Sequence, residues 1–222
     1  MTRHPHARGL GMASSRSRER LVQQLREEGI RDARVLAAIA KVPRHRFIDE
    51  ALASRAYDNT ALPIGFGQTI SQPYVVARMT EQLLAEPGVR TVLEVGTGCG
   101  YQTAILAELV DQVYSIERLQ PLYQQARTRL RELGYTRVWL LHGDGYKGWP
   151  EHAPYDGILV AAASHSVPEA LLRQLKPGGR MIIPVGPPGC QVLQRIVRTE
   201  TGYETAALDA VSFVPLVSGS LP

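Results

Sequence analysis

Residues 91–107 of this 222-residue chain read TVLEVGTGCGYQTAILA. An apolar run ends at Val95, and glycines at positions 96, 98 and 100 separate it from residues of helical character. Glycines at alternate positions allow a ligand to lie directly against the backbone at the carboxyl edge of a sheet. A plain tight turn would need only one of them. The segment therefore predicts a buried strand over 91–95, a ligand-binding loop and a helix over about 101–109.

Strands and helices alternate along the chain after this loop. Such alternation is typical of parallel sheets with right-handed crossovers, so we expect an α/β fold with a mostly parallel, doubly wound sheet. A terminal antiparallel pair, formed by 191–200 and 203–216, extends that sheet. The other predicted elements are strands over 112–117, 137–142, 155–162 and 180–186, and helices over 119–133 and 168–175.

The residues before the glycine loop predict a helical cap. Apolar residues recur at helical spacing, and Pro73 suits the first turn of a helix. Residues 57–72 carry a proline, glycines and hydroxyls without a period, which predicts a loop. The predicted helices cover 16–28, 32–41, 45–55 and 73–84.

The expected organisation is one domain with a short leader. Residues 1–14 predict a basic, disordered leader, and 15–222 form a single domain. Within it, 15–88 supply the helical cap and an active-site loop, and 89–222 supply the cofactor-binding sheet. Hydrophobic residues make up 44% of the chain and charged residues 21%, proportions that exclude wholesale disorder.

Charge and cysteine content narrow the class of protein. The net charge is +4, and arginines concentrate near the N-terminus, where a basic arm either binds nucleic acid or is merely solvated. We favour the second interpretation and expect no nucleic-acid partner. The two cysteines, Cys99 and Cys190, lie far apart, which argues against a disulfide framework and a zinc site. With no apolar leader and no membrane-length run, a cytoplasmic, monomeric protein is expected.

The glycine loop favours one nucleotide ligand over another. A dinucleotide fold requires a third glycine at position 101, where this chain has Tyr101. Glu94, two residues before the first glycine, would also repel a pyrophosphate. S-adenosylmethionine carries an ammonium, a sulfonium and no phosphate, so an acid there would favour it. The spacing E-x-G-x-G-x-G resembles the first motif of Rossmann-like methyltransferases.

Two further acids follow the ends of predicted strands. Glu117 lies 21 residues after Gly96, where a carboxylate can accept hydrogen bonds from both ribose hydroxyls; a surface acid is the alternative. Asp144 stands between two glycines and either accepts from an adenine amino group or makes an aspartate turn. Three acids at three successive strand ends favour the ligand-binding interpretation.

A second motif precedes the glycine loop. Residues 67–73 read GQTISQP and resemble the signature of protein-L-isoaspartate O-methyltransferases. The resemblance covers nearly everything from about residue 14 to the end. It includes VPRHRFID (42–49), VLEVGTGCGYQTAILA (92–107), VYSIER (113–118), HGDGYKGWPEHAPYDGILV (142–160), LKPGG (175–179) and FVPLVSG (213–219).

This resemblance implies a Rossmann-like S-adenosylmethionine-dependent methyltransferase that repairs damaged proteins. Such an enzyme moves a methyl group onto the free α-carboxylate of L-isoaspartyl residues in proteins and peptides, and the ester then closes to a succinimide that partly restores aspartate. An α-carboxyl has a pKa of about 3.5 and is ionised at neutral pH, so its attack needs no general base. No metal ion is expected.

The resemblance also implies site residues. It carries the catalytic position to Ser71, whose hydroxyl can donate to the acceptor carboxylate; the alternative is a helix cap for the helix at Pro73. The predicted cofactor-binding residues are Gln68, Thr69, Ile70, Glu94, Gly96, Thr97, Gly98, Gly100, Glu117, Arg118, Asp144 and Gly145.

The sequence departs from the family pattern at two places, and two other functions remain open. Cys99 stands where a serine is common, and Ser164-His165 follow three alanines where related enzymes usually continue with proline. The second departure affects acceptor preference. The alternatives are a methyltransferase for a small-molecule carboxylate, hydroxyl or amine, and a basic nucleic-acid-binding module. The sequence lacks the interleaved aromatic and basic residues expected of a nucleic-acid-binding module.

Overall fold

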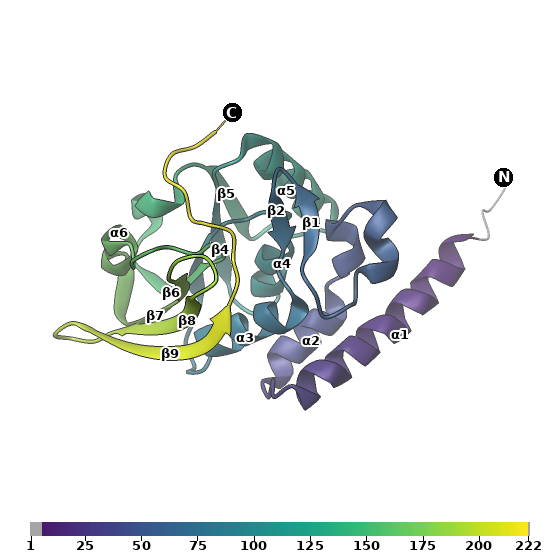
Figure 1. The fold of residues 1–222 in the computed structure, drawn as a ribbon, viewed down its shortest axis with the longest axis horizontal. Helices are drawn as coiled ribbons and strands as arrows, with labels where there is room; N and C mark the ends of the chain where they lie inside the picture. Colours follow the sequence, from purple (N-terminus) through teal and green to yellow (C-terminus); the bar gives the residue numbers. More distant parts are fainter. Residues whose placement is uncertain (1–5, 222) are drawn as a thin grey trace.

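The computed structural model describes residues 6–221. A seven-stranded sheet in the order β5-β4-β3-β6-β7-β8-β9 forms the centre of the molecule (Figure 1). The five strands from β5 to β7 run parallel, and β8 is antiparallel to both of its neighbours. This confirms the mostly parallel α/β sheet with a terminal antiparallel pair. The strands are β3 (Thr91–Val95), β4 (Gln112–Glu117), β5 (Val138–His142), β6 (Tyr155–Val160), β7 (Leu175–Val185), β8 (Gln191–Arg198) and β9 (Tyr203–Val211).

Helices pack on both faces of this sheet. Consecutive residues of β3 pack in different hydrophobic clusters: Val92 packs with Met79 and Leu106 on one face, and Leu93 packs with Leu171 on the other. Strand side chains alternate between faces, so this arrangement buries both sides of β3. The helices are α3 (Pro73–Leu83), α4 (Tyr101–Ala107), α5 (Gln120–Glu132) and α6 (Glu169–Arg173), with short 3-10 turns η3 (Gly145–Lys147) and η4 (Pro150–His152).

The N-terminal residues form the expected helical cap. It comprises α1 (His6–Glu27), α2 (Ala33–Lys41), η1 (Arg44–Phe47) and η2 (Glu50–Arg55). Leu21, Val22 and Leu25 of α1 are buried, as their helical spacing predicted. The helix predicted over 45–55 is two 3-10 turns instead. No helix in the described residues is long and apolar enough to cross a membrane.

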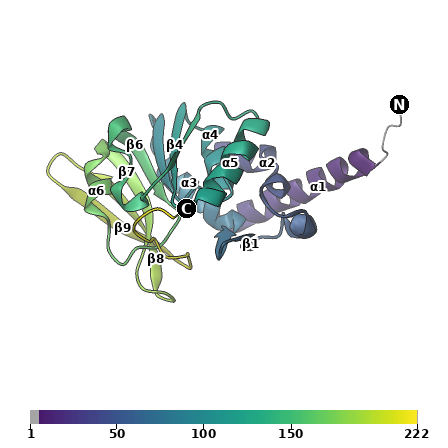
Figure 2. The ribbon, with the colours of Figure 1, turned by 90° about the horizontal axis from the view of Figure 1, so that it is seen from above.

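The first helix differs from the prediction at its beginning. It begins at His6, so it runs through much of the stretch predicted to be a disordered leader, and it projects from the body of the molecule (Figures 1 and 2). Once the packed turns around Leu25 form, adding further turns costs little, which explains the extension. Residues 1–5 of the predicted leader lie outside the described residues, and the division at residue 88 stays a prediction.

The predicted loop over 57–72 contains a hairpin. Its strands β1 (Leu62–Gly65) and β2 (Gln68–Ile70) pair antiparallel. The sequence pattern did not predict this hairpin because each strand is short and β1 contains Pro63. At the C-terminal end, β9 stops at Val211 rather than 216, because Val211 pairs with Gln191, the first residue of β8, and β8 offers no partner beyond it.

Candidate active site

A pocket opens at the carboxyl ends of the parallel strands. Four segments supply most of its lining: hairpin β1–β2 with Ser71, the glycine loop 96–99, the end of β4, and residues 214–217 of the C-terminal segment. The predicted site residues that line it are Gln68, Thr69, Ile70, Ser71, Gly96, Thr97, Gly98, Glu117, Arg118 and Gly145. The fold therefore gathers ten of the thirteen predicted residues, from segments distant in the sequence, around one cavity.

Glu117 holds the glycine loop as well as facing the pocket. Its Oε2 accepts a 2.8 Å hydrogen bond from the Gly98 N–H, and Oε1 accepts a 2.9 Å bond from the Leu119 N–H. The side chain is only 5% exposed. Each carboxylate oxygen has a second lone pair, so both can still accept from hydroxyls of a ligand.

Most backbone N–H groups of the glycine loop are already bound within the protein. The N–H groups of Gly96 and Thr97 donate to the Ile116 carbonyl, and Gly100 N–H donates to the Thr97 carbonyl. Gly98 N–H is bound to Glu117. Pyrophosphate binding depends on free N–H groups in such a loop. The loop geometry therefore favours a ligand without phosphate, in agreement with the argument from sequence.

Glu94 lies behind the loop and does not line the pocket. Its Oε2 accepts 2.5 Å hydrogen bonds from the hydroxyls of Thr103 and Ser115, and Thr97 Oγ1 lies 2.6 Å from Ser115 Oγ. Because Ser115 donates to Glu94, Thr97 donates to Ser115. This chain of hydroxyls ties the loop to β4 and α4. Glu94 Oε1 is buried without a partner among the described residues.

Burial raises the pKa of Glu94 to about 8, against the hydrogen bonds from Ser115 and Thr103, which lower it. The folded protein thus holds this proton more tightly than the unfolded chain. The contribution of Glu94 to the free energy of unfolding is fully present when the pH is below the ordinary pKa of about 4.5, and it is lost as the pH rises through about 8. We expect the free energy of unfolding of the ligand-free protein to fall by a few kcal/mol over this range through Glu94 alone.

The isosteric variant Glu94→Gln should lose this part of the pH dependence, because an amide does not titrate. Urea unfolding of both proteins between pH 5 and pH 8.5 measures it. Glu204→Gln, at an exposed glutamate of β9, is the control and should follow the original protein. If the free energy of unfolding of Glu94→Gln depended on pH in the same way as that of the original protein, Glu94 would be ionised throughout this pH range.

Gly100 and Asp144 also lie outside the lining. Gly100 has a φ of 91° and precedes α4, and a Cβ added there would lie 3.3 Å from Leu130 of α5. This glycine is needed for the turn and for helix packing. Asp144 Oδ1 accepts from the Tyr146 N–H at 2.9 Å and caps η3, as the aspartate-turn alternative expected. The cofactor contacts of Glu94, Gly100 and Asp144 stay predictions.

Ser71 is not the cap of α3. The cap position belongs to Gln72, which makes no side-chain capping bond. The N–H of Tyr74, in the first turn, donates instead to Asn59 Oδ1 at 2.9 Å. Among the described residues no hydrogen bond is made by the Ser71 hydroxyl, so this group is available at the pocket. The capping alternative for Ser71 is therefore wrong.

Asn59 is a positioning residue that the sequence analysis missed. Its Nδ2 donates to both oxygens of Glu28, at 2.9 and 2.7 Å, while its Oδ1 accepts from Tyr74. It thereby joins α1, the base of hairpin β1–β2 and α3. Ser71 lies between this hairpin and α3, so Asn59 fixes both ends of the segment that carries it. Only an asparagine in a turn-rich stretch hinted at this role.

The C-terminal strap, residues 213–221, was also missed. The Ala163 N–H donates to the Val214 carbonyl, and the Leu216 N–H donates to the Ala163 carbonyl. Further on, Arg118 Nε donates to the Gly219 carbonyl at 3.3 Å. Arg118 therefore lines the pocket and also holds the strap. The strap runs from the end of β9 across the molecule to the C-terminus (Figure 1). Its residues 214–217 line one side of the pocket.

The residues at the departure from the family pattern differ in exposure. Ser164 is 2% exposed, and its hydroxyl lies 3.2 Å from that of Tyr146. His165 is exposed and does not line the pocket. Among residues 6–221 no group of three or more His, Cys, Asp or Glu side chains could hold a metal ion.

The polar groups that line the pocket suit S-adenosylmethionine. Glu117 supplies a carboxylate for ribose hydroxyls, and most N–H groups of the loop are already bound within the protein rather than available to a phosphate. Apolar residues such as Ile64 and Leu216 complete the lining. The residues present therefore fit a nucleoside that bears cationic rather than anionic groups.

Comparisons with known proteins agree with this site. The family model described as protein-L-isoaspartate(D-aspartate) O-methyltransferase matches residues 16–221. A protein-L-isoaspartate O-methyltransferase from Halorhodospira halophila is 58% identical over 98% of this chain and 99% of its own length. One from Pseudomonas paraeruginosa is 57% identical over 95% of this chain and 100% of its own.

Solved structures give the same result. A protein-L-isoaspartate O-methyltransferase has a TM-score of 0.81 at 29% identity, over 89% of this chain and 65% of its own. A Plasmodium falciparum protein described as a protein-L-isoaspartate O-methyltransferase, in complex with S-adenosyl-L-homocysteine, has a TM-score of 0.77 at 27% identity, over 89% of this chain and 96% of its own. The chain belongs to the protein-L-isoaspartate(D-aspartate) O-methyltransferase family.

Proposed function

We propose that this protein is a repair enzyme that transfers a methyl group from S-adenosyl-L-methionine to the free α-carboxylate of L-isoaspartyl residues. The observation that carries the proposal is the Ser71 hydroxyl, which lines the pocket without a hydrogen bond among the described residues. Family membership supports the acceptor class. The ester would close to a succinimide, and its hydrolysis would restore part of the normal aspartate.

Each part of the site has a distinct task in this proposal. Glu117 would hold the ribose hydroxyls, and Gln68, Thr69 and Ile70 would close over the cofactor from the hairpin. S-adenosylmethionine supplies a methyl group already activated by its sulfonium. The chain's own residues then need only bring the carboxylate to the pocket, orient it and exclude water.

The Ser71 hydroxyl would donate a hydrogen bond to one oxygen of the acceptor carboxylate. The other oxygen would then be free to bond to the methyl carbon while the carbon–sulfur bond breaks and S-adenosylhomocysteine leaves, and the serine proton would stay on Ser71. No general base is required because an α-carboxyl with a pKa of about 3.5 is already ionised at neutral pH. This accounts for a pocket whose lining, in the part of the chain that the structure describes, contains no histidine or lysine.

The proposal is tested with a matched pair of peptides. An isoaspartyl peptide and its normal aspartyl counterpart are incubated with the enzyme and methyl-labelled S-adenosylmethionine. We expect label only in the isoaspartyl peptide, as a base-labile ester that decays to succinimide. Equal labelling of both peptides, or label that survives mild alkali, would instead indicate the alternative, a methyltransferase for a small-molecule carboxylate, hydroxyl or amine.

The proposed partners are damaged proteins and peptides that contain isoaspartate. The hairpin and the C-terminal strap border the mouth of the pocket, where a polypeptide acceptor would have to enter. The monomeric state, the cytoplasmic location and the absence of a nucleic-acid partner remain predictions from the sequence.

A further inference from the structure

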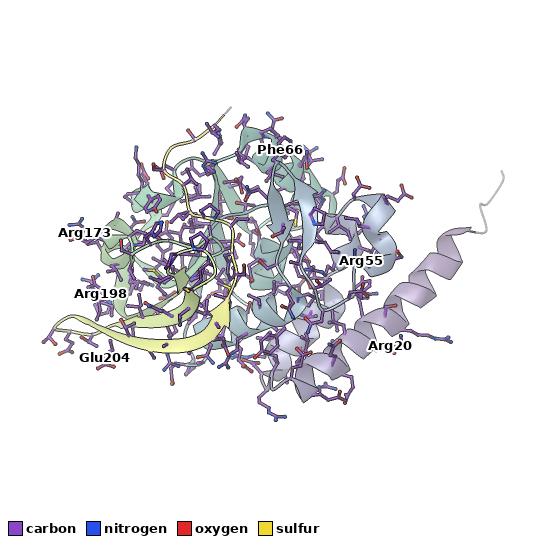
Figure 3. The ribbon with its side chains drawn as sticks, in the orientation of Figure 1. Arg20, Arg55, Phe66, Arg173, Arg198 and Glu204 are labelled. Carbon is purple, nitrogen blue, oxygen red and sulfur yellow. The ribbon has the colours of Figure 1, made fainter. Side chains whose placement is uncertain are left out.

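Phe66 combines exposure with an unusual backbone conformation. It occupies the turn of hairpin β1–β2 (Figure 3), and it is 56% exposed. Its φ of 55° is the only positive value of a non-glycine residue among residues 6–221, and Gly65 and Gly67 on either side also have positive φ. A bulky residue in the left-handed region is strained, and folds often keep such strain at a functional site.

The hairpin holds this turn at the rim of the pocket. Ile64 and Gln68, two positions away on each side, both line the pocket. A Cβ added at Gly98 would lie 3.4 Å from Ile64 Cδ1, so the hairpin rests on the glycine loop. Gln68 Nε2 also donates to the Phe66 carbonyl at 3.3 Å. The strained turn is thus tied to residues of the site.

We propose that Phe66 contacts the side chain next to the isoaspartyl residue of the acceptor peptide and gives the enzyme a preference for apolar flanking residues. This inference rests on the proposed function. The reacting carboxylate must reach Ser71, which follows the same hairpin directly, so the neighbouring peptide residues remain at the rim.

The rim offers an apolar surface for such a neighbour. Val217, which lines the pocket from the strap, is 40% exposed, and the Phe66 ring adds a larger apolar area. Contact between these groups and an apolar side chain of the peptide removes apolar surface of both partners from water, which favours binding. A glycine neighbour has no side chain to bury and gains no such binding energy.

The test compares two isoaspartyl peptides that differ only in the flanking residues, leucine on both sides or glycine on both sides. We expect a lower KM for the leucine peptide with the original enzyme. Phe66→Ala should raise that KM about fivefold and leave the KM of the glycine peptide and both kcat values unchanged. Phe66→Leu should keep most of the preference. Trp139→Ala is the matched control, because Trp139 is also 56% exposed but lies on β5.

A purely structural role for Phe66 predicts a different pattern. Asparagine tolerates the left-handed conformation, so Phe66→Asn should melt at the same or a higher temperature and yet lose the preference. If Phe66 only stabilises the hairpin, its variants should change the melting temperature and should raise the KM of both peptides by the same factor. The proposal would be overturned if the ratio of the KM for the leucine peptide to the KM for the glycine peptide were the same in the original enzyme and in Phe66→Ala. If the original enzyme methylates neither peptide, the proposed function itself fails.

Discussion

Glu117→Ala should weaken the binding of S-adenosyl-L-homocysteine about a hundredfold or more. The substitution would remove the proposed acceptor for both ribose hydroxyls, and each lost hydrogen bond to a charged group is worth about 1.5–3 kcal/mol. It would also release the N–H groups of Gly98 and Leu119, which Glu117 now holds at 2.8 and 2.9 Å. The glycine loop would then lose its anchor. Isothermal titration calorimetry measures the affinity.

Glu117→Gln separates the two tasks. The amide oxygen can still accept from Gly98, but the amide nitrogen cannot accept from Leu119 or from a hydroxyl. We expect this variant to unfold at nearly the original temperature and to bind the ligand about tenfold more weakly. Unchanged affinity in Glu117→Ala would remove Glu117 from the site, and tight binding of NAD to the original protein would refute the cofactor.

The sheet and its ligand loop were predictable because their signals are local. A buried apolar run followed by alternate glycines predicted β3 and the loop, and an acid at the next strand end predicted Glu117. These features depend on residues adjacent in the sequence and on the rule that parallel strands place their carboxyl ends at one edge. The resemblance then supplied Ser71 and the hairpin residues.

The contacts that position Ser71 were not predictable, because they join distant segments. Asn59 meets Glu28 across 31 positions and Tyr74 across 15. No periodic pattern encodes such contacts, and a short hairpin with a proline in one strand gives almost no strand signal. The strap was mistaken for the end of a strand for a related reason, since its path is set by Ala163 and Arg118.

Glu94 shows how burial changes the meaning of a motif. The sequence placed an acid at a strand tip and suggested a charge that faces a cationic ligand. In the fold, this side chain of β3 is buried against Thr103 of α4 and Ser115 of β4. Without water around it, the carboxyl favours its neutral form, so its pKa rises. A motif gives the residue type, but its neighbours determine the protonation state.

Ser71→Ala should lower kcat with isoaspartyl peptide by about ten- to hundredfold while cofactor affinity stays almost unchanged. The reason is that a misplaced carboxylate rarely reaches the methyl group in line, and rate depends steeply on such placement. Melting should hardly change, because Gln72 occupies the cap position and Asn59 serves the Tyr74 N–H. A lost cap would have cost about 1 kcal/mol. Turnover and thermal melting are measured on the same preparations.

Two further substitutions decide between a hydroxyl that orients the acceptor and a residue that merely fills space. Ser71→Thr keeps the hydroxyl and should retain more turnover than Ser71→Ala, although its extra methyl group narrows the pocket. Ser71→Asn keeps a polar group but moves it outward along a longer side chain, so it should not restore turnover. If Ser71→Ala turns over at nearly the original rate, the hydroxyl has no catalytic role. The backbone of residues 68–71, which lie along the chain between Asn59 and its hydrogen-bond partner Tyr74, would then be the element that positions the acceptor.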